Sequence, residues 1–146
     1  MTLRPALLTF ALPALLVIGC AGSPRCKPSA QAGSARVAYC ELITQAEKYD
    51  GRKVLTEATW TAGLHADSLI DMACREVNGR PASTTVSGPV NDSLERRALY
   101  SILEARRSAK VAVVGIFHVG RRGGDAGPTG QPYGLEVECI LRVGAE

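Results

Sequence analysis

The chain has 146 residues, and 17 Lys and Arg against 14 Asp and Glu give a formal net charge of +3. This length predicts a single folded domain, and the near balance of charges excludes a strong electrostatic attraction to nucleic acid or to anionic lipid. Two histidines and two phenylalanines are little material for a catalytic metal site or for base stacking, and the sequence predicts no cofactor, no metal and no nucleic-acid partner.

The first element along the chain is an apolar segment at its beginning. Met1 to Arg4 carry one positive charge, and Pro5 to Ile18 are apolar except for Thr9. This length is typical of the hydrophobic part of a secretion signal, whereas a transmembrane helix needs about 20 apolar residues. Two prolines inside the segment argue further against a helix that spans a membrane.

The segment ends in Val17-Ile18-Gly19-Cys20, which resembles the lipobox of bacterial lipoproteins. The resemblance implies a signal peptide over residues 1–19, cleavage before Cys20, and lipidation of Cys20 with acyl chains such as palmitate. It implies a bacterial cell-envelope protein that is bound to the membrane through this lipid anchor. Because Ala21 rather than Asp follows Cys20, the resemblance implies the periplasmic face of the outer membrane in a Gram-negative cell. The alternative is an ordinary signal peptide that is cleaved nearby, with Cys20 incidental.

Residues 20–35 are rich in Ser, Gly, Pro and Ala and are predicted to form a flexible tether. Lipidation of Cys20 leaves four cysteines, an even number in an oxidising compartment, and their spacing fits no zinc site. Three pairings are open among Cys26, Cys40, Cys74 and Cys139. We favour a disulfide between Cys40 and Cys74, because both residues flank regular elements. A disulfide that closes a loop of this length stabilises the folded state by about 3–4 kcal/mol. Cys26 and Cys139 are then free or bridged, and Cys139 is equally consistent with a buried thiol.

Residues 36–146 are predicted to form the folded domain. Apolar spacing predicts helices over residues 37–48 and 91–107, the second capped by Asp92 and Glu95 with an apolar stripe that starts at Leu94. Alternation and β-branched residues predict strands over 53–62, 69–73 and 135–143, with a short edge strand at 83–86. In the first of these, one face is formed by Val54, Thr56, Ala58 and Trp60, and the other by Leu55, Glu57, Thr59 and Thr61. In the last, the residues expected to point inward are Leu135, Val137, Cys139, Leu141 and Val143, and those expected to point outward are Glu136, Glu138 and Arg142. The continuous apolar run within 110–119 predicts a central strand buried on both faces.

This order predicts a mainly β (α+β) fold, namely a small OB-like five-stranded antiparallel barrel. One helix precedes the barrel, and the other lies between its third and fourth strands. The stretch Tyr39-Cys40-Glu41-Leu42-Ile43, followed by Tyr49-Asp50-Gly51-Arg52-Lys53-Val54, resembles a family of small bacterial OB-like proteins. In that family a short helix opens with Cys-x-Leu and feeds the first barrel strand through Tyr-x-Gly-Lys-x-Val. The resemblance covers about 20 residues and implies a fold but no catalytic residues.

Several residues have side chains that could serve as catalytic or ligand-binding groups. His65-Ala66-Asp67-Ser68 holds the residue types of a hydrolase triad, but four successive residues in a turn cannot converge on one another, so a polar hairpin turn is the better interpretation. His118 is interpreted as a structural residue. The arginines of the 91–107 helix are interpreted as a solvated face, because the chain lacks the aromatic series of a single-strand-binding barrel.

The Gly-rich loop over residues 120–134 is the predicted contact region, because long irregular loops in small domains often bind partners. Its candidate contact residues are Arg121, Arg122, Asp125 and Tyr133. Trp60 is the only tryptophan and is expected either in the core or at the lip of a barrel groove.

The sequence therefore predicts a membrane-anchored envelope lipoprotein that is not an enzyme and has no catalytic residues. We expect a non-catalytic binding or accessory module for an envelope protein, peptide or glycan. An envelope-acting hydrolase is the alternative function.

Overall fold

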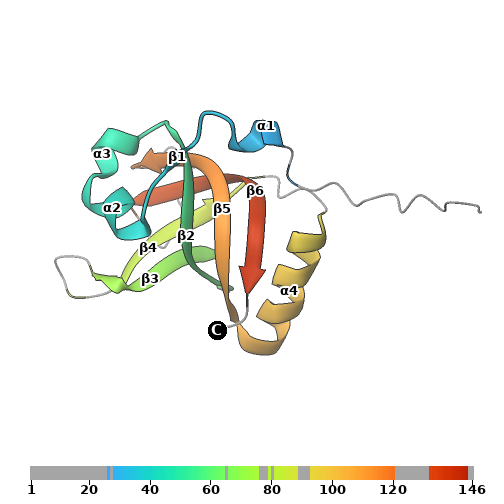
Figure 1. The fold of residues 1–146 in the computed structure, drawn as a ribbon. Coiled ribbons are helices and arrows are strands. Elements are labelled where there is room, and N and C mark those ends of the chain that lie inside the picture. The colour runs from blue at the N-terminus through green and yellow to red at the C-terminus, as the bar shows by residue number, and fades with distance from the viewer. Residues whose placement is uncertain are drawn as a thin grey trace, which may run out of the picture.

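The computed structural model describes residues 26, 28–64, 66–75, 79, 81–88, 93–120 and 132–144. Within them the chain is mainly β, with four helical segments (Figure 1). The elements run in the order α1 (Pro28–Gln31), β1 (Ala35–Arg36), α2 (Tyr39–Thr44), α3 (Ala46–Tyr49), β2 (Lys53–Thr61), β3 (Ser68–Arg75), β4 (Pro81–Ser87), α4 (Leu94–Arg106), β5 (Ser108–Val119) and β6 (Tyr133–Gly144).

The strands of the described residues form one six-stranded sheet in the order β1-β2-β3-β4-β6-β5, and β2 also pairs with β5. The predicted all-antiparallel arrangement of five strands is corrected in two respects. The two-residue β1 adds a sixth strand, parallel to β2. Strand β4 meets β6 in parallel, which is possible because α4 and β5 lie between them in the chain and carry it back across the sheet. The other pairs are antiparallel.

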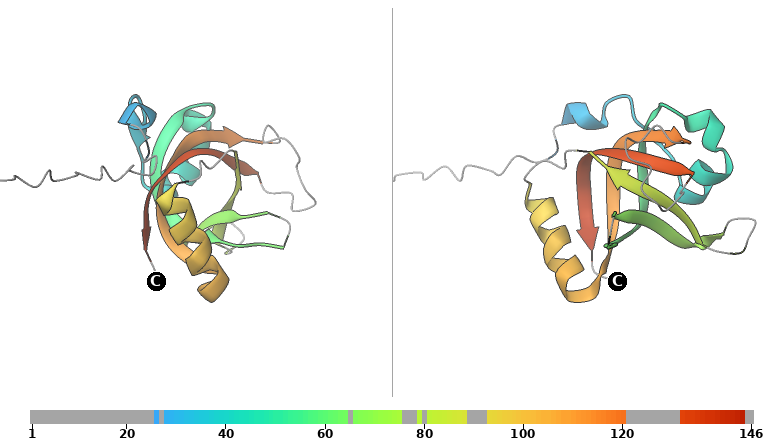
Figure 2. Two further views of the ribbon diagram at one scale, coloured as in Figure 1. Left: turned by 90° about the vertical axis from the view of Figure 1, so that its right-hand side faces the viewer. Right: turned by 180° about the vertical axis from the view of Figure 1, so that it is seen from behind.

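The sheet curves strongly, and α2 and α3 lie at one place around it while α4 lies at another (Figures 1 and 2). Helices α2 and α3 contact β2, β3 and β5 at one end, and α4 packs against β5 and β6 elsewhere. The predicted 37–48 helix is in fact two short helices, because Gln45 leaves the helical region at φ −117° and ψ 34°. Between them, α2 and α3 bury Leu42, Ile43 and Tyr49.

Helix α4 begins three residues later than predicted. Its N-cap is Ser93, whose hydroxyl accepts a hydrogen bond from the Arg96 backbone N–H at 3.1 Å, whereas the predicted cap Asp92 lies outside the described residues. The helix buries Leu99 and Leu103 and leaves Leu94 exposed. It ends at Arg107 in the left-handed conformation, φ 62°, whose N–H donates to the carbonyl of Leu103.

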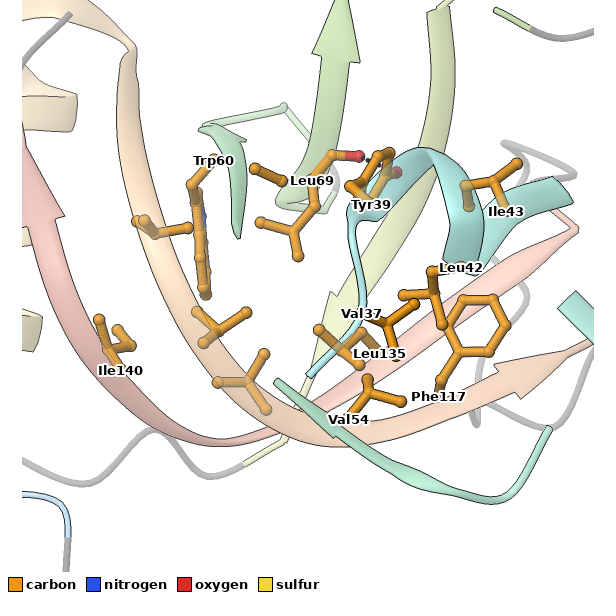
Figure 3. Packing of buried hydrophobic residues seen from close by; sticks show 14 of the residues in the cluster. Val37, Tyr39, Leu42, Ile43, Val54, Trp60, Leu69, Phe117, Leu135 and Ile140 are labelled. Carbon is orange, nitrogen blue, oxygen red and sulfur yellow. Dashed lines mark hydrogen bonds between the residues drawn. The ribbon is translucent and has the colours of Figure 1, made fainter. Parts of the chain in front are cut away.

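The core lies on the concave side of the curved sheet (Figure 3). The predicted alternation along β2 is confirmed, since Val54, Thr56, Ala58 and Trp60 are all buried. Trp60 is only 2% exposed, so it belongs to the core and not to a groove lip. Strand β5 is buried from Val111 to Gly115, as expected for a strand that has β2 on one side and β6 on the other.

Strand β6 departs from the predicted alternation at its centre. Register shifts interrupt its pairing with β5, so that Ala112 pairs with Arg142, Val113 with Ile140 and Val114 with Cys139. Ile140 is therefore a core residue, while Leu141, predicted to face inward, is half-buried. Each extra residue of a β-bulge reverses the direction of the side chains that follow it.

Candidate functional site

A polar cleft of about 380 Å³ lies on the face of the sheet that points away from the core. Two rows of paired residues cross β2, β5 and β6 at this place: Glu57–Ala112–Arg142 and Thr59–Lys110–Gly144. Directly opposed residues of neighbouring strands share a face, so side chains from three strands converge there. Asp71 of β3 also lines the cleft.

Glu57 is the electrostatic centre of this cleft. Its carboxylate accepts from Arg142, with Nη2 at 2.8 Å from Oε2, and from Arg36 of β1, with Nη2 at 3.4 Å from Oε1. All three side chains are substantially exposed, so each pair contributes at most about 1 kcal/mol to stability. The ion pairs orient the two arginines around one carboxylate rather than holding the fold together.

The cleft combines both signs of charge in a small hollow. Lys110 is exposed, and the carboxylate of Asp71 accepts a hydrogen bond from the Ala73 backbone N–H at 2.9 Å. A hollow of this size holds a small ligand or one or two side chains of a partner. Because Glu57 already accepts from two arginines, its charge suits binding of a polar, charged group better than proton transfer.

A second polar group lies inside the fold, beside α2. The Tyr39 hydroxyl donates to the carbonyl of Leu69 at 2.8 Å and lies 2.8 Å from the Thr84 hydroxyl. The carbonyl of Ala82 is 3.4 Å away. Burial raises the pKa of Tyr39 well above its ordinary value of 10.0, and the hydrogen bond with Thr84 opposes part of that rise. This neutral, fully buried hydroxyl fixes α2 on β3 and β4.

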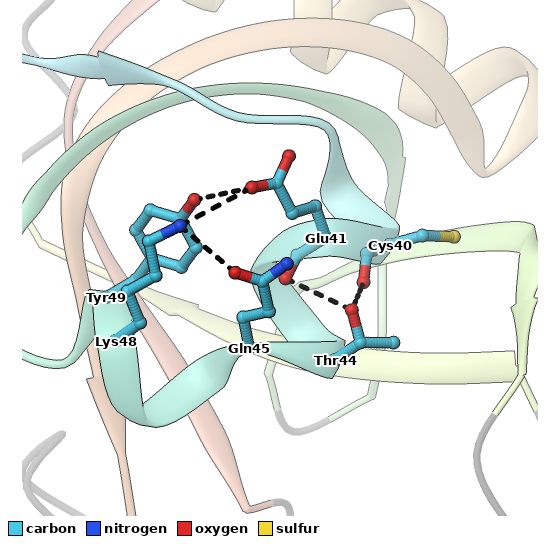
Figure 4. Close-up of polar contacts among 6 residues, drawn as sticks. All are labelled: Cys40, Glu41, Thr44, Gln45, Lys48 and Tyr49. Atoms are coloured by element: carbon cyan, nitrogen blue, oxygen red, sulfur yellow. Dashed lines mark hydrogen bonds and ion pairs between the residues drawn. The ribbon is translucent and has the colours of Figure 1, made fainter.

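Polar side chains also connect α2 with α3 (Figure 4). The Tyr49 hydroxyl donates to the Glu41 carboxylate at 2.7 Å, and the Lys48 ammonium donates to the Gln45 side-chain oxygen at 3.0 Å. The Cys40 thiol points away from this group (Figure 4). These contacts hold the two short helices together.

The cysteines are placed differently from the pairing that the sequence favoured. Cys26 forms a disulfide with Cys139, and their Cα atoms are 5.8 Å apart. Cys40 and Cys74 are free. Burial, followed by the influence of the nearby Cys40 thiol, raises the pKa of the Cys74 thiol from 9.0 to about 12. Cys40 and Cys74 are therefore neighbours, but they form no disulfide.

The disulfide also corrects the description of residues 20–35 as a free tether. Cys26 is joined to Cys139 of β6, and α1 and the first residue of β1 lie within the segment predicted to be irregular. The composition of the segment predicts flexibility, but the disulfide holds Cys26 at the sheet and strand pairing holds Ala35 and Arg36 at β2.

The predicted contact residues are not gathered by the structure into one site. Trp60 lies in the core, and Tyr133 is half-buried and stacks on Phe117 with ring centroids 5.9 Å apart. Arg121, Arg122 and Asp125 lie outside the described residues, as do Cys20 and His65. The cleft was not predicted from the sequence. The alternation placed Glu57 and Thr59 on one face of their strand and Arg142 on the outward side of another, but only the strand register brings them together.

Two further observations concern membranes and metals. None of the described helices is long and apolar enough to cross a membrane. Within the described ranges, no three His, Cys, Asp or Glu side chains lie close enough together to hold a metal ion. In comparisons with known proteins, no family model, no curated protein and no solved structure matches this chain.

Proposed function

We propose that this protein is a lipid-anchored lipoprotein of the bacterial cell envelope that acts as a non-catalytic binding or accessory module. The lipobox-like Val17-Ile18-Gly19-Cys20 supports the anchor. The observation that carries the proposal is the disulfide between Cys26 and Cys139, because disulfides persist in oxidising compartments and are rare in the cytosol. The lipobox-like sequence and the disulfide are independent observations, and both favour export.

We further propose that β2 to β6 form an OB-like barrel. Starting from β2, the successive pairings β2–β3, β3–β4, β4–β6, β6–β5 and β5–β2 return to their starting strand. The helix α4 lies between the third and fourth of these strands, which is the order of an OB-type barrel. The two-residue β1 is an addition at the edge of β2.

The cleft around Glu57 is the proposed contact surface of this module. It offers Glu57 and Asp71 as acceptors and Lys110 and Arg142 as donors in one hollow. Such a mixture complements a partner that carries both charges, such as a peptide segment of an envelope protein or a wall peptide.

Intact mass of the protein isolated from bacterial membranes tests the anchor. We expect a chain that starts at Cys20, carries acyl chains and partitions with membranes, while a Cys20→Ala variant does not. An unacylated chain found in the cytosol with Cys26 and Cys139 reduced contradicts the proposal.

Photocrosslinking from the cleft tests the binding surface. A crosslinking side chain replaces Lys110 in the cleft or, as a matched control, the exposed Glu104 on α4. A specific envelope adduct from position 110 that is absent from position 104 supports a contact surface, and equal labelling from both positions contradicts it. Release of fragments from purified cell wall by the intact lipoprotein favours the hydrolase alternative instead.

A further inference from the structure

The disulfide attaches the N-terminal segment to one particular face of the sheet. Cys139 pairs with Val114 of β5, and Val114 pairs with Leu55 of β2. Ala112, in the middle of the Glu57–Ala112–Arg142 row, is two residues from Val114 on the same strand, so both rows lie on the same face. The attachment point and the cleft are therefore neighbours on the outer face of β2, β5 and β6.

The position of Cys26 in the chain limits how far this face can lie from Cys20. Cys26 follows Cys20 by six positions, and six extended residues span at most about 21 Å. Without the disulfide, the first residue held in the sheet is Ala35. The 15 positions from Cys20 to Ala35 then span at most about 52 Å. The disulfide thus shortens the connection between a lipid on Cys20 and the sheet by more than half.

We propose that the Cys26–Cys139 disulfide is an orienting tether, which holds the domain close to the lipid headgroups with the outer face of β2, β5 and β6 toward the bilayer. This inference rests on the proposed lipid anchor at Cys20. Because the cleft lies one row away from the disulfide, it is membrane-proximal, and α4 faces away. The cleft therefore binds a charged segment that lies along the membrane surface, such as the membrane-proximal part of another anchored envelope protein.

Energy transfer from the single tryptophan to the membrane measures this distance. Trp60 is fixed in the core, and the full lipoprotein is reconstituted in phosphatidylethanolamine and phosphatidylglycerol vesicles that contain a dansyl-headgroup lipid. The oxidised protein is expected to transfer energy to the dansyl group. Cys26→Ser is expected to lose most of that transfer, and Cys40→Ser, which keeps the disulfide, is the matched control.

A second variant separates the tether from the stability of the fold. A ten-residue Gly-Ser insertion between Cys20 and Cys26 keeps the disulfide but lengthens the reach from about 21 to about 56 Å. It is expected to lose transfer as Cys26→Ser does. Equal transfer from the insertion variant and the unaltered protein overturns the inference, whatever Cys26→Ser does.

The outcome is distinguishable from a failure of the lipid anchor. Intact mass shows acylation before reconstitution, and Cys20→Ala is expected to leave the vesicles altogether. Vesicle binding that does not require Cys20 contradicts the proposed anchor. Acylated protein whose transfer is the same for every variant leaves the anchor intact and removes only the orienting role of the disulfide.

Discussion

Removal of Cys26 is expected to destabilise the domain severely. The disulfide joins residues separated by 113 positions. In the chain-entropy model, opening a loop of that length raises the conformational entropy of the unfolded chain. The free energy of unfolding falls by about 4.8 kcal/mol at room temperature as a result. A small domain has a total free energy of unfolding of about 5–15 kcal/mol, so Cys26→Ser loses a third or more of it.

The variant Cys26→Ser is preferable to a change at Cys139. Cys139 is 7% exposed and remains in the variant as a small buried thiol, which behaves as an apolar group. The change therefore removes the bond with little effect on packing. Ala32→Ser, an exposed change in the same segment that also introduces a hydroxyl, serves as the control and is expected to shift the unfolding free energy by less than about 0.5 kcal/mol.

Urea unfolding followed by far-ultraviolet circular dichroism measures the effect. With a urea dependence of about 1.5 kcal/mol per molar, a loss of 4.8 kcal/mol lowers the midpoint by about 3 M. The reduced, unaltered protein is expected to be no more stable than the oxidised Cys26→Ser variant. A midpoint for Cys26→Ser that equals that of Ala32→Ser refutes the loop-closure reasoning and the disulfide together.

Three positions yield further predictions. Tyr39→Phe removes a hydroxyl with buried partners and is expected to cost about 1–3 kcal/mol in urea unfolding. Because burial raises the pKa of Tyr39 above 10.0, its stabilising contribution is complete below pH 10 and is lost as the pH rises toward the folded-state pKa. Unfolding free energy should then fall by up to about 1.4 kcal/mol per pH unit, a slope that Tyr39→Phe removes. Gly115→Ala places a methyl group against the backbone carbonyl of Glu136 and is expected to cost about 1–3 kcal/mol in the same assay. Glu57→Gln should change stability by less than about 1 kcal/mol but weaken the specific crosslink from position 110; an undiminished crosslink contradicts the role of Glu57.

The parts of the fold that were predicted correctly depend on local patterns. The alternation of Val54, Thr56, Ala58 and Trp60 predicted β2 and the side chains that share one of its faces, and the apolar run that ends near Phe117 predicted β5. In both strands the signal lies in neighbouring residues of one segment. Hydrophobic periodicity reports such segments directly, so no knowledge of the partner strand was needed.

The errors occur where the outcome depends on residues far apart in the chain. The two-residue β1 exists only because β2 supplies its hydrogen-bonding partner, and Ala35-Arg36 alone carries no strand signal. The cleft is similar: Glu57 and Arg142 are 85 positions apart, and both are ordinary outward-facing residues until the register places them in the same row.

The incorrect cysteine pairing has a local cause in β6. A regular strand whose Leu135 and Val137 face the core places Cys139 there too, as the predicted alternation did. The register shifts at Val114/Gly115 and at Ala112/Val113 give β6 two additional residues, one before Cys139 and one before Arg142. The first turns Cys139 to the outer face, where it meets Cys26, and the second returns Arg142 to that same face, opposite Ala112. Consequently the proposed tether and the proposed contact surface share a face because β6 carries two bulges rather than one.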